Sequence, residues 1–178
     1  MEHSPPEGEA LLDLLQAYLE TDYHVASPEG SLTFHVGREN SGNDMLLIGA
    51  GAERWAVITA WNPHSQHRSW EENDEAQDRL KKAIESRGLK WWEAAGKHPS
   101  NDWPAEESCL ILNNAPRPAR ELCREFGQLA VLFGETGDAP WLLFGNWEQI
   151  GPQLKAASPD GPEWSSLLAQ TIERNDAL

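Results

Sequence analysis

The sequence predicts an α+β fold whose centre is a ferredoxin-like (split βαβ) antiparallel sheet, with additional elements at both ends of the chain. Residues 55–61, W-A-V-I-T-A-W, are apolar and rich in β-branched and aromatic side chains, which is typical of a central strand. From residue 55 to residue 134 the order of patterns is strand, helix, strand, strand, helix, strand. This is the split βαβ order, in which the helices cover one face of the sheet.

Local signals support each element of this core. Ser69-Trp-Glu-Glu72 fits a capping box that starts a helix, and Gly88 is placed to end it. The pattern P-A-R-E-L-C-R-E-F predicts a second helix, which Gly127 would end. The remaining core strands are expected at 89–96, 107–112 and 129–134.

The flanking segments are expected to add an N-terminal helix with short strands (1–54) and a C-terminal strand and helix (140–175). Apolar residues recur at helical spacing between residues 10 and 19, and a turn S-P-E-G separates two short strand patterns. The expected flanking elements are a loose terminus at 1–8, a helix at 10–19, strands at 23–25 and 31–37, a polar loop at 38–44, a short apolar segment at 45–51, a strand at 140–145 and a helix at 164–172.

Length, charge and cysteine count restrict the class of protein. A chain of 178 residues suits a single domain, 1–178, with its own core. The formal net charge of -15 disfavours nucleic acid and anionic membranes as partners. We expect Cys109 and Cys123 to be reduced and buried, since both lie in apolar patterns. Without an apolar run long enough for a membrane span or a signal peptide, we expect a cytoplasmic protein.

The predicted topology brings three polar segments to one edge of the sheet. In the split βαβ order, residues 59–65, 103–108 and 128 all lie at the edge where the first core helix begins. The free N–H groups of that helix end favour an anion. Ordinary turns explain the same residues, because loops must lie at one edge or the other. The candidate ligand-binding residues are Thr59, Asn62, Ser65, Asn73, Trp103, Glu106, Glu107 and Gln128.

The motifs T-A-W-N-P-x-S, E-N, W-P-A-E-E-S and F-G-Q-L-A-V, in this order, resemble a bacterial family known as domain of unknown function 3293. The resemblance covers about residues 55–134 and implies a small bacterial cytosolic protein, but no activity. Leu129 departs from the family pattern, in which an Asn often follows F-G-Q. The signature positions implied are Thr59, Asn62, Pro63, Ser65, Asn73, Trp103, Glu106, Glu107, Ser108, Gly127 and Gln128.

The residues at this edge suit recognition of a small polar ligand or a protein partner. Asn62 and Gln128 offer donors and acceptors, and Trp103 offers an aromatic wall. The alternative is a hydrolase or transferase that uses Glu107 as general acid/base at the same edge. His64 and His67 invite a metal site, but a solvated turn is the default interpretation, and no cofactor motif is complete.

Overall fold

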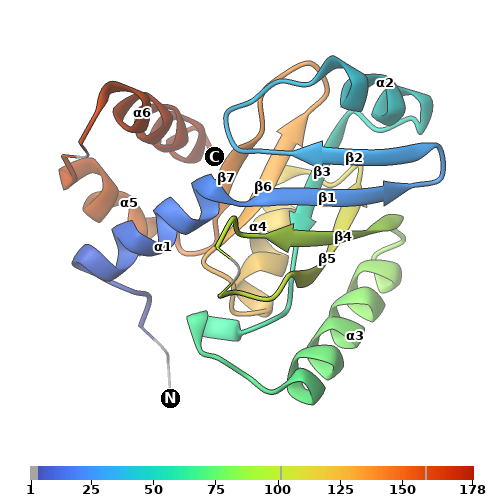
Figure 1. Ribbon diagram of the computed structural model, residues 1–178, viewed down its shortest axis with the longest axis horizontal. Coiled ribbons are helices and arrows are strands. Elements are labelled where there is room, and N and C mark those ends of the chain that lie inside the picture. Colours follow the sequence, from blue (N-terminus) through green and yellow to red (C-terminus); the bar gives the residue numbers. More distant parts are fainter. Residues whose placement is uncertain (1–3, 101, 159) are drawn as a thin grey trace.

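The computed structural model describes residues 4–100, 102–158 and 160–178, in which helices and strands are mixed (Figure 1). A short 3-10 helix, η1 (Pro63–Ser65), lies between the third strand and the third helix. In chain order, the other elements are α1 (Gly8–Glu20), β1 (Asp22–Ser27), β2 (Gly30–Phe34), α2 (Ser41–Gly49), β3 (Arg54–Ile58), α3 (Trp70–Ser86), β4 (Trp91–Lys97), β5 (Glu106–Leu112), α4 (Pro116–Glu125), β6 (Ala130–Glu135), β7 (Trp141–Phe144), α5 (Trp147–Ala156) and α6 (Pro162–Asp176).

The seven described strands form one antiparallel sheet in the order β2-β1-β4-β5-β3-β6-β7. The four central strands are those of the region 54–135, with α3 between β3 and β4 and α4 between β5 and β6. The β1–β2 hairpin extends the sheet beyond β4, and β7 extends it beyond β6. The sheet curls, so that β1 and β2 cross steeply over the direction of β3 and β6 (Figure 1).

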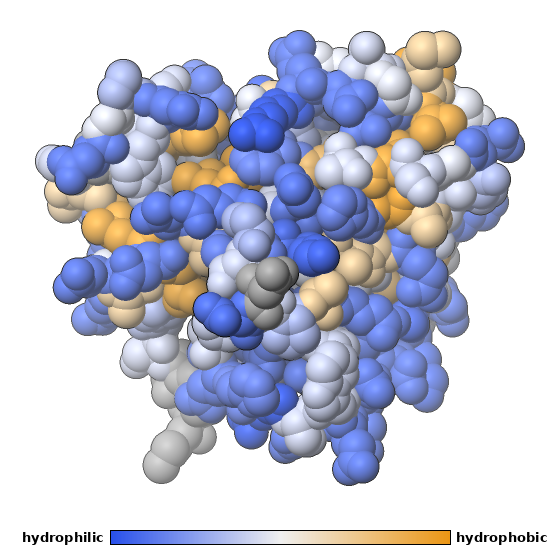
Figure 2. Space-filling model, viewed as in Figure 1, coloured by the Kyte–Doolittle hydropathy of each residue, from blue (hydrophilic) through white to orange (hydrophobic). Residues whose placement is uncertain are grey.

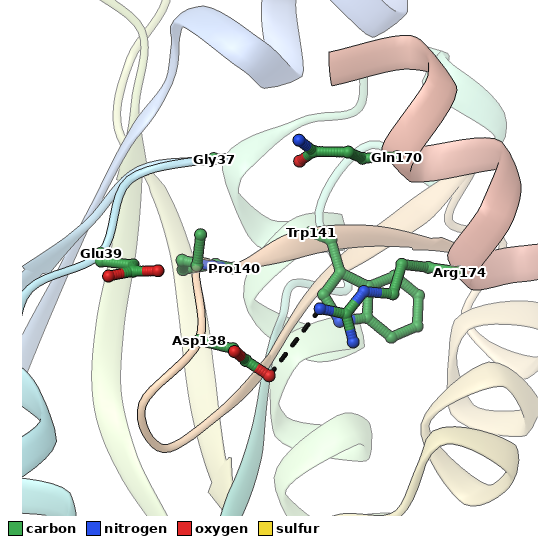
Figure 3. A pocket seen from close by; sticks show the side chains of 8 residues that line it. Gly37, Glu39, Asp138, Pro140, Trp141, Gln170 and Arg174 are labelled. Atoms are coloured by element: carbon green, nitrogen blue, oxygen red, sulfur yellow. Dashed lines mark ion pairs between the residues drawn. The ribbon is translucent and has the colours of Figure 1, made fainter. Parts of the chain in front are cut away.

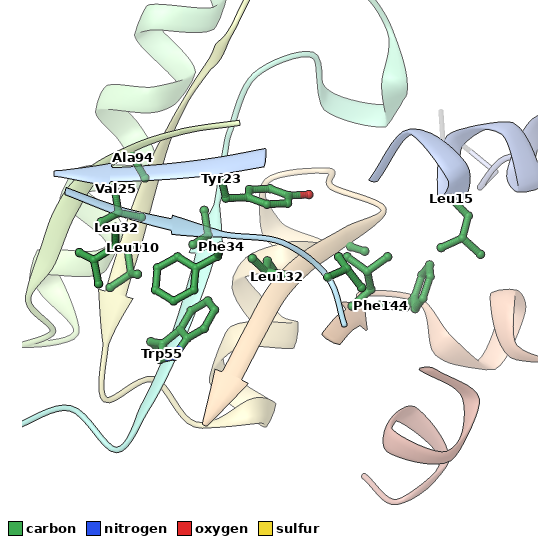
Figure 4. Close-up of a cluster of buried hydrophobic side chains, with 14 of the residues drawn as sticks. Leu15, Tyr23, Val25, Leu32, Phe34, Trp55, Ala94, Leu110, Leu132 and Phe144 are labelled. Atoms are coloured by element: carbon green, nitrogen blue, oxygen red, sulfur yellow. The ribbon is translucent and has the colours of Figure 1, made fainter. Parts of the chain in front are cut away.

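Each face of the sheet carries its own apolar core. On one face Ala76, Leu80 and Ile84 of α3, together with Leu122 of α4, pack against alternate residues of β3, β5 and β6. The other face is enclosed by the curl of the sheet and by apolar residues from α1, α2, α5 and α6 (Figure 4). The flanking elements therefore cover the face that α3 and α4 leave open.

Trp55 is the largest fully buried side chain of the enclosed core, and it packs closely against residues of the neighbouring strands. Its ring centroid lies 4.2 Å from that of Phe34 on β2. Gly134, its cross-strand partner on β6, has no room for a side chain, since a Cβ there would lie 2.2 Å from the Trp55 ring. A glycine inside a strand thus marks a close approach of a large side chain to the backbone.

Several sequence predictions are confirmed at the level of single residues. The capping box is present, with Ser69 Oγ accepting from Glu72 N at 3.2 Å and Glu72 Oε2 accepting from Ser69 N at 2.9 Å. Gly88 follows α3 with a φ of 70°. Cys109 and Cys123 are free and buried, and burial raises the pKa of each thiol to about 12.

Two helices differ from the sequence prediction. The polar loop expected at 38–44 instead provides the N-cap of α2, because the Asn40 side chain accepts from Gly42 N and Asn43 N. Helix α5 was not predicted, since Gly151 and Pro152 interrupt its pattern. Burial of Ile150 and Leu154 stabilises this helix despite the proline. Tertiary packing here outweighs the low helix propensity of the local sequence.

The surface seen in Figure 2 is mainly hydrophilic, in keeping with the net charge of -15. Apolar atoms gather at the upper right, where α2 lies in Figure 1. Met45 and Ile48 of α2 are 74% and 63% exposed there. No helix among the described residues combines the length and the apolar character needed to cross a membrane.

Candidate functional site

The segment that follows β3 has an unusual backbone. Asn62, His64 and Ser65 have φ angles of 48°, 59° and 58°, in the left-handed region that non-glycine residues seldom occupy. Such residues cost about 1 kcal/mol or more each, and they persist only where the surroundings hold them. They also cluster at functional sites, so this segment, residues 62–65, is termed the left-handed loop below.

A side-chain network centred on Asn62 holds the left-handed loop. Its Nδ2 donates to Glu106 Oε1 at 2.9 Å, and its Oδ1 accepts from Arg68 N at 3.0 Å and from Asn73 Nδ2 at 3.2 Å. Its backbone N donates to Asn73 Oδ1 at 2.9 Å. Asn62 is thus bonded to β5, to α3 and to Arg68 just ahead of α3, which explains how its left-handed conformation is maintained.

The end of α4 closes the same loop from the other side. Gln128 Nε2 donates to Trp61 O at 3.0 Å, and His64 N donates to Gly127 O at 2.7 Å. Gly127 has a φ of 64°, and a Cβ there would lie 3.0 Å from both Pro63 and His64. The motifs N-P-x-S and F-G-Q therefore form one contact, in which glycine is required for the close approach.

Glu106 and Glu107, adjacent on β5, point to opposite faces of the sheet. Glu106 lies on the enclosed face, where burial raises the pKa of its carboxyl and the bond from Asn62 partly offsets that rise. Burial also raises the pKa of the phenols of Tyr18 and Tyr23, and the charge of Glu106 adds to the rise.

The Glu107 carboxylate lies on the opposite face, beside α3. Its Oε1 lies 2.5 Å from Lys81 Nζ, and Glu93 Oε1 lies 3.8 Å from the same nitrogen. Burial lowers the pKa of Lys81, but the hydrogen bond and charge of Glu107 and the charge of Glu93 outweigh it, so the pKa is raised. Its backbone carbonyl accepts from Thr59 Oγ1 at 2.7 Å, three residues ahead of the left-handed loop.

The structure brings together five of the eight candidate residues by their side chains, namely Thr59, Asn62, Asn73, Glu106 and Gln128. Ser65 is exposed on the loop, and Trp103 is 60% exposed ahead of β5. Within the described part of the chain, no hydrogen bond joins either side chain to the network of Asn62. His64 and His67 are exposed, and no group of three or more His, Cys, Asp or Glu among the described residues is arranged to hold a metal.

A hollow of about 340 Å³ lies beside the left-handed loop, between α3 and the end of α4. Arg79 of α3 reaches it from between two small residues, Ala76 and Ala83, and has no ion-pair partner among the described residues. Arg79 was not predicted as a site residue from the sequence, although the spacing of these three residues places them on one helix face. The hollow is lined by Ala60, Pro63, His64, Ala76, Arg79, Ala83, Glu125, Phe126 and Gly127.

Comparison with known proteins bears on this site. Neither the curated proteins nor the solved structures yield a significant match to the chain. A family model, described as protein of unknown function (DUF3293), matches residues 58–131. That span contains the left-handed loop, both glutamates and Gln128, and every residue that lines the hollow. In residues 58–131, the chain therefore resembles this family, as its motifs predicted.

Proposed function

We propose that the protein recognises a small polar ligand that carries an anionic group, in the hollow beside the left-handed loop, with the anionic group against Arg79. Of the edge segments 59–65, 103–108 and 128 that the sequence suggested for this role, only 59–65 lines the hollow. The observation that carries the proposal is that a loop with three left-handed non-glycine residues forms one wall of this hollow. A volume of about 340 Å³ is within the range of small-molecule sites.

The chemistry of the walls supports this ligand class. Arg79 supplies a guanidinium, which binds carboxylate and phosphate oxygens in pairs. Pro63 and Phe126 supply apolar surface for the rest of the molecule. Glu125, the acidic residue on the rim, is already bonded to Arg87 at 2.8 Å, which lessens its repulsion of an anion.

The scaffold is proposed to be a ferredoxin-like unit over residues 55–134. The strand order β4-β5-β3-β6, all antiparallel, supports it, as does the place of α3 and α4 on one face. That the chain is one domain, and that it is a bacterial cytoplasmic protein, stay predictions. The reduced, buried cysteines agree with a reducing compartment.

Isothermal titration calorimetry with a panel of small carboxylates and phosphates, starting from inorganic phosphate, citrate and adenosine monophosphate, tests the ligand class. We expect at least one compound to bind, and Arg79→Gln to weaken it by about tenfold or more. Arg117→Gln is the matched control, since it removes an exposed arginine from α4 outside the hollow. The proposal is wrong if no compound of the panel binds, or if Arg79→Gln binds as tightly as Arg117→Gln.

Two alternatives predict different results. A protein partner at this edge predicts complex formation that weakens with salt and is unaffected by small anions at the hollow. An enzyme that uses Glu107 as general acid/base predicts turnover that is lost in Glu107→Gln.

A further inference from the structure

A second hollow, of about 480 Å³, lies outside the family match, where the segment after β2, the β6–β7 turn and α6 meet (Figure 3). Its charged and polar side chains come from all three of these elements. Glu39 and Gln170 reach toward the space from opposite sides, and Asp138 faces Arg174 across its floor (Figure 3). It is lined by Gly37, Glu39, Asp138, Ala139, Pro140, Trp141, Gln170 and Arg174.

The walls of this hollow are fastened to one another. Gly37 N donates to Pro140 O at 2.8 Å, which ties the segment after β2 to the β6–β7 turn. Gly37 has a φ of 74°, and a Cβ there would lie 2.4 Å from Leu167 Cδ2 of α6. A residue other than glycine would be strained at this φ, and the end of the Leu167 side chain would have to move. The segment after β2 therefore contacts both other elements that line the hollow.

The polar groups at the hollow are incompletely paired. Arg174 stacks over Trp141 with its guanidinium carbon 5.8 Å from the ring centroid, and its Asp138 contact is 3.8 Å, too long for a hydrogen bond. Trp141 is only 7% exposed, and its buried Nε1 has no hydrogen-bond partner among the described residues. A buried donor without an acceptor costs about 1–3 kcal/mol, so this side of the hollow is not optimised for stability.

We propose that this hollow binds a small zwitterion with an ammonium group and a carboxylate, as a free amino acid has. The ammonium lies between the carboxylates of Glu39 and Asp138. The ligand carboxylate accepts from Arg174 and Gln170. The arrangement needs both charges on one molecule, because the hollow carries two carboxylates on one side and one guanidinium on the other.

Thermal shift and calorimetry with each standard L-amino acid at about 10 mM test this proposal. We expect at least one to raise the melting temperature, and Arg174→Gln and Glu39→Gln each to weaken binding by about tenfold. The amide of the bound amino acid, which lacks the carboxylate, should bind weakly to wild type and no more weakly to Arg174→Gln. The N-acetyl form of the same amino acid, which lacks the ammonium, should bind weakly to wild type and no more weakly to Glu39→Gln.

Glu29→Gln and Arg117→Gln serve as charge-matched controls, since both residues are exposed and outside the two hollows. Arg79→Gln should leave amino-acid binding unchanged, which separates this hollow from the one beside the left-handed loop. Glu39 is exposed on a segment outside the helices and strands, so its variant should fold even if Arg174→Gln does not. The proposal fails if no amino acid binds, or if binding survives in both Glu39→Gln and Arg174→Gln.

Discussion

The two faces of the sheet at the start of β5 differ in what their carboxylates contact, Glu106 on one face and Glu107 on the other. On the enclosed side, Glu106 accepts a bond from Asn62 and joins a network of neutral amides that extends into α3. On the α3 side, Glu107 forms an ion pair with Lys81 at a site that is 35% exposed. Successive strand residues point to opposite faces, so one dipeptide supplies two unlike environments.

This difference indicates which polar groups at the edge stabilise the fold and which of them are typical of a functional site. The network of Asn62 maintains a strained loop, so its polar groups act first as structure. The carboxylate of Glu106, by contrast, is held where burial disfavours its charge. A perturbed carboxylate beside a strained loop is what functional sites commonly contain. The ion pair of Glu107 is of the ordinary kind found on protein surfaces.

The largest expected effect is that of Asn62→Ala. It leaves Glu106 Oε1 without its donor and Arg68 N without its acceptor, removes one of the bonds donated by Asn73 Nδ2, and places alanine at a φ of 48°. We expect the free energy of unfolding to fall by about 2–4 kcal/mol in urea denaturation. Asn113→Ala is the matched control, because Asn113 also has a left-handed φ and two side-chain bonds to backbone, but is exposed.

If Asn62→Ala costs no more than Asn113→Ala, the network does not hold the loop, and the contrast between the two sides of β5 is lost. The opposite result assigns the network a structural role.

Glu106→Gln should have a smaller effect of opposite sign. Glutamine keeps an oxygen that can accept from Asn62 and removes the charge that burial disfavours. We expect a gain on the order of 1 kcal/mol at pH 7. Because the folded-state pKa is raised, the stability linked to this carboxyl is complete below the ordinary glutamate pKa and is lost as pH rises through the raised value.

The gain of Glu106→Gln over wild type should accordingly shrink as the pH is lowered from 7 toward 4, in unfolding curves recorded at several pH values. Glu107→Gln, the neighbouring carboxylate, is the control and should show no such gain. A loss of stability in Glu106→Gln at pH 7 would contradict the assigned cost of burying this charge.

Glu107→Gln should have the smallest effect. Its ion pair with Lys81 is partly exposed, so we expect a loss of less than about 1 kcal/mol at low salt. Salt at about 0.5 M should reduce this loss by screening, whereas the cost of Asn62→Ala should persist. A salt-independent loss of several kcal/mol would show that the pair is as integral to the fold as the network on the other side.

The sequence predicted a large part of the fold and some of the site. The capping box of Ser69 and Glu72 correctly predicted the start of α3. The helices and strands between residues 55 and 134 follow one another in the predicted order. The predicted convergence of residues 59–65, 103–108 and 128 agrees in part with the contacts of Thr59, Asn62 and Gln128. Ser65 and Trp103, which belong to the same predicted edge, are exposed. Helix α5 was not predicted because Gly151 and Pro152 interrupt its helical pattern of apolar residues. The helix is stabilised by burial of Ile150 and Leu154, which the local sequence does not indicate.

The sequence by itself determined the order of the core elements, the caps of its helices and the apolar faces that pack, since these depend on residues a few positions apart. Only the tertiary structure decided which carboxylate meets Asn62, where the loop becomes left-handed and which arginine reaches each hollow. Asn62 and Glu106 are 44 residues apart in the chain, and Glu39 and Arg174 come from opposite ends of it. Such partnerships depend on sheet register and curl, for which no local pattern of residues gives a signal.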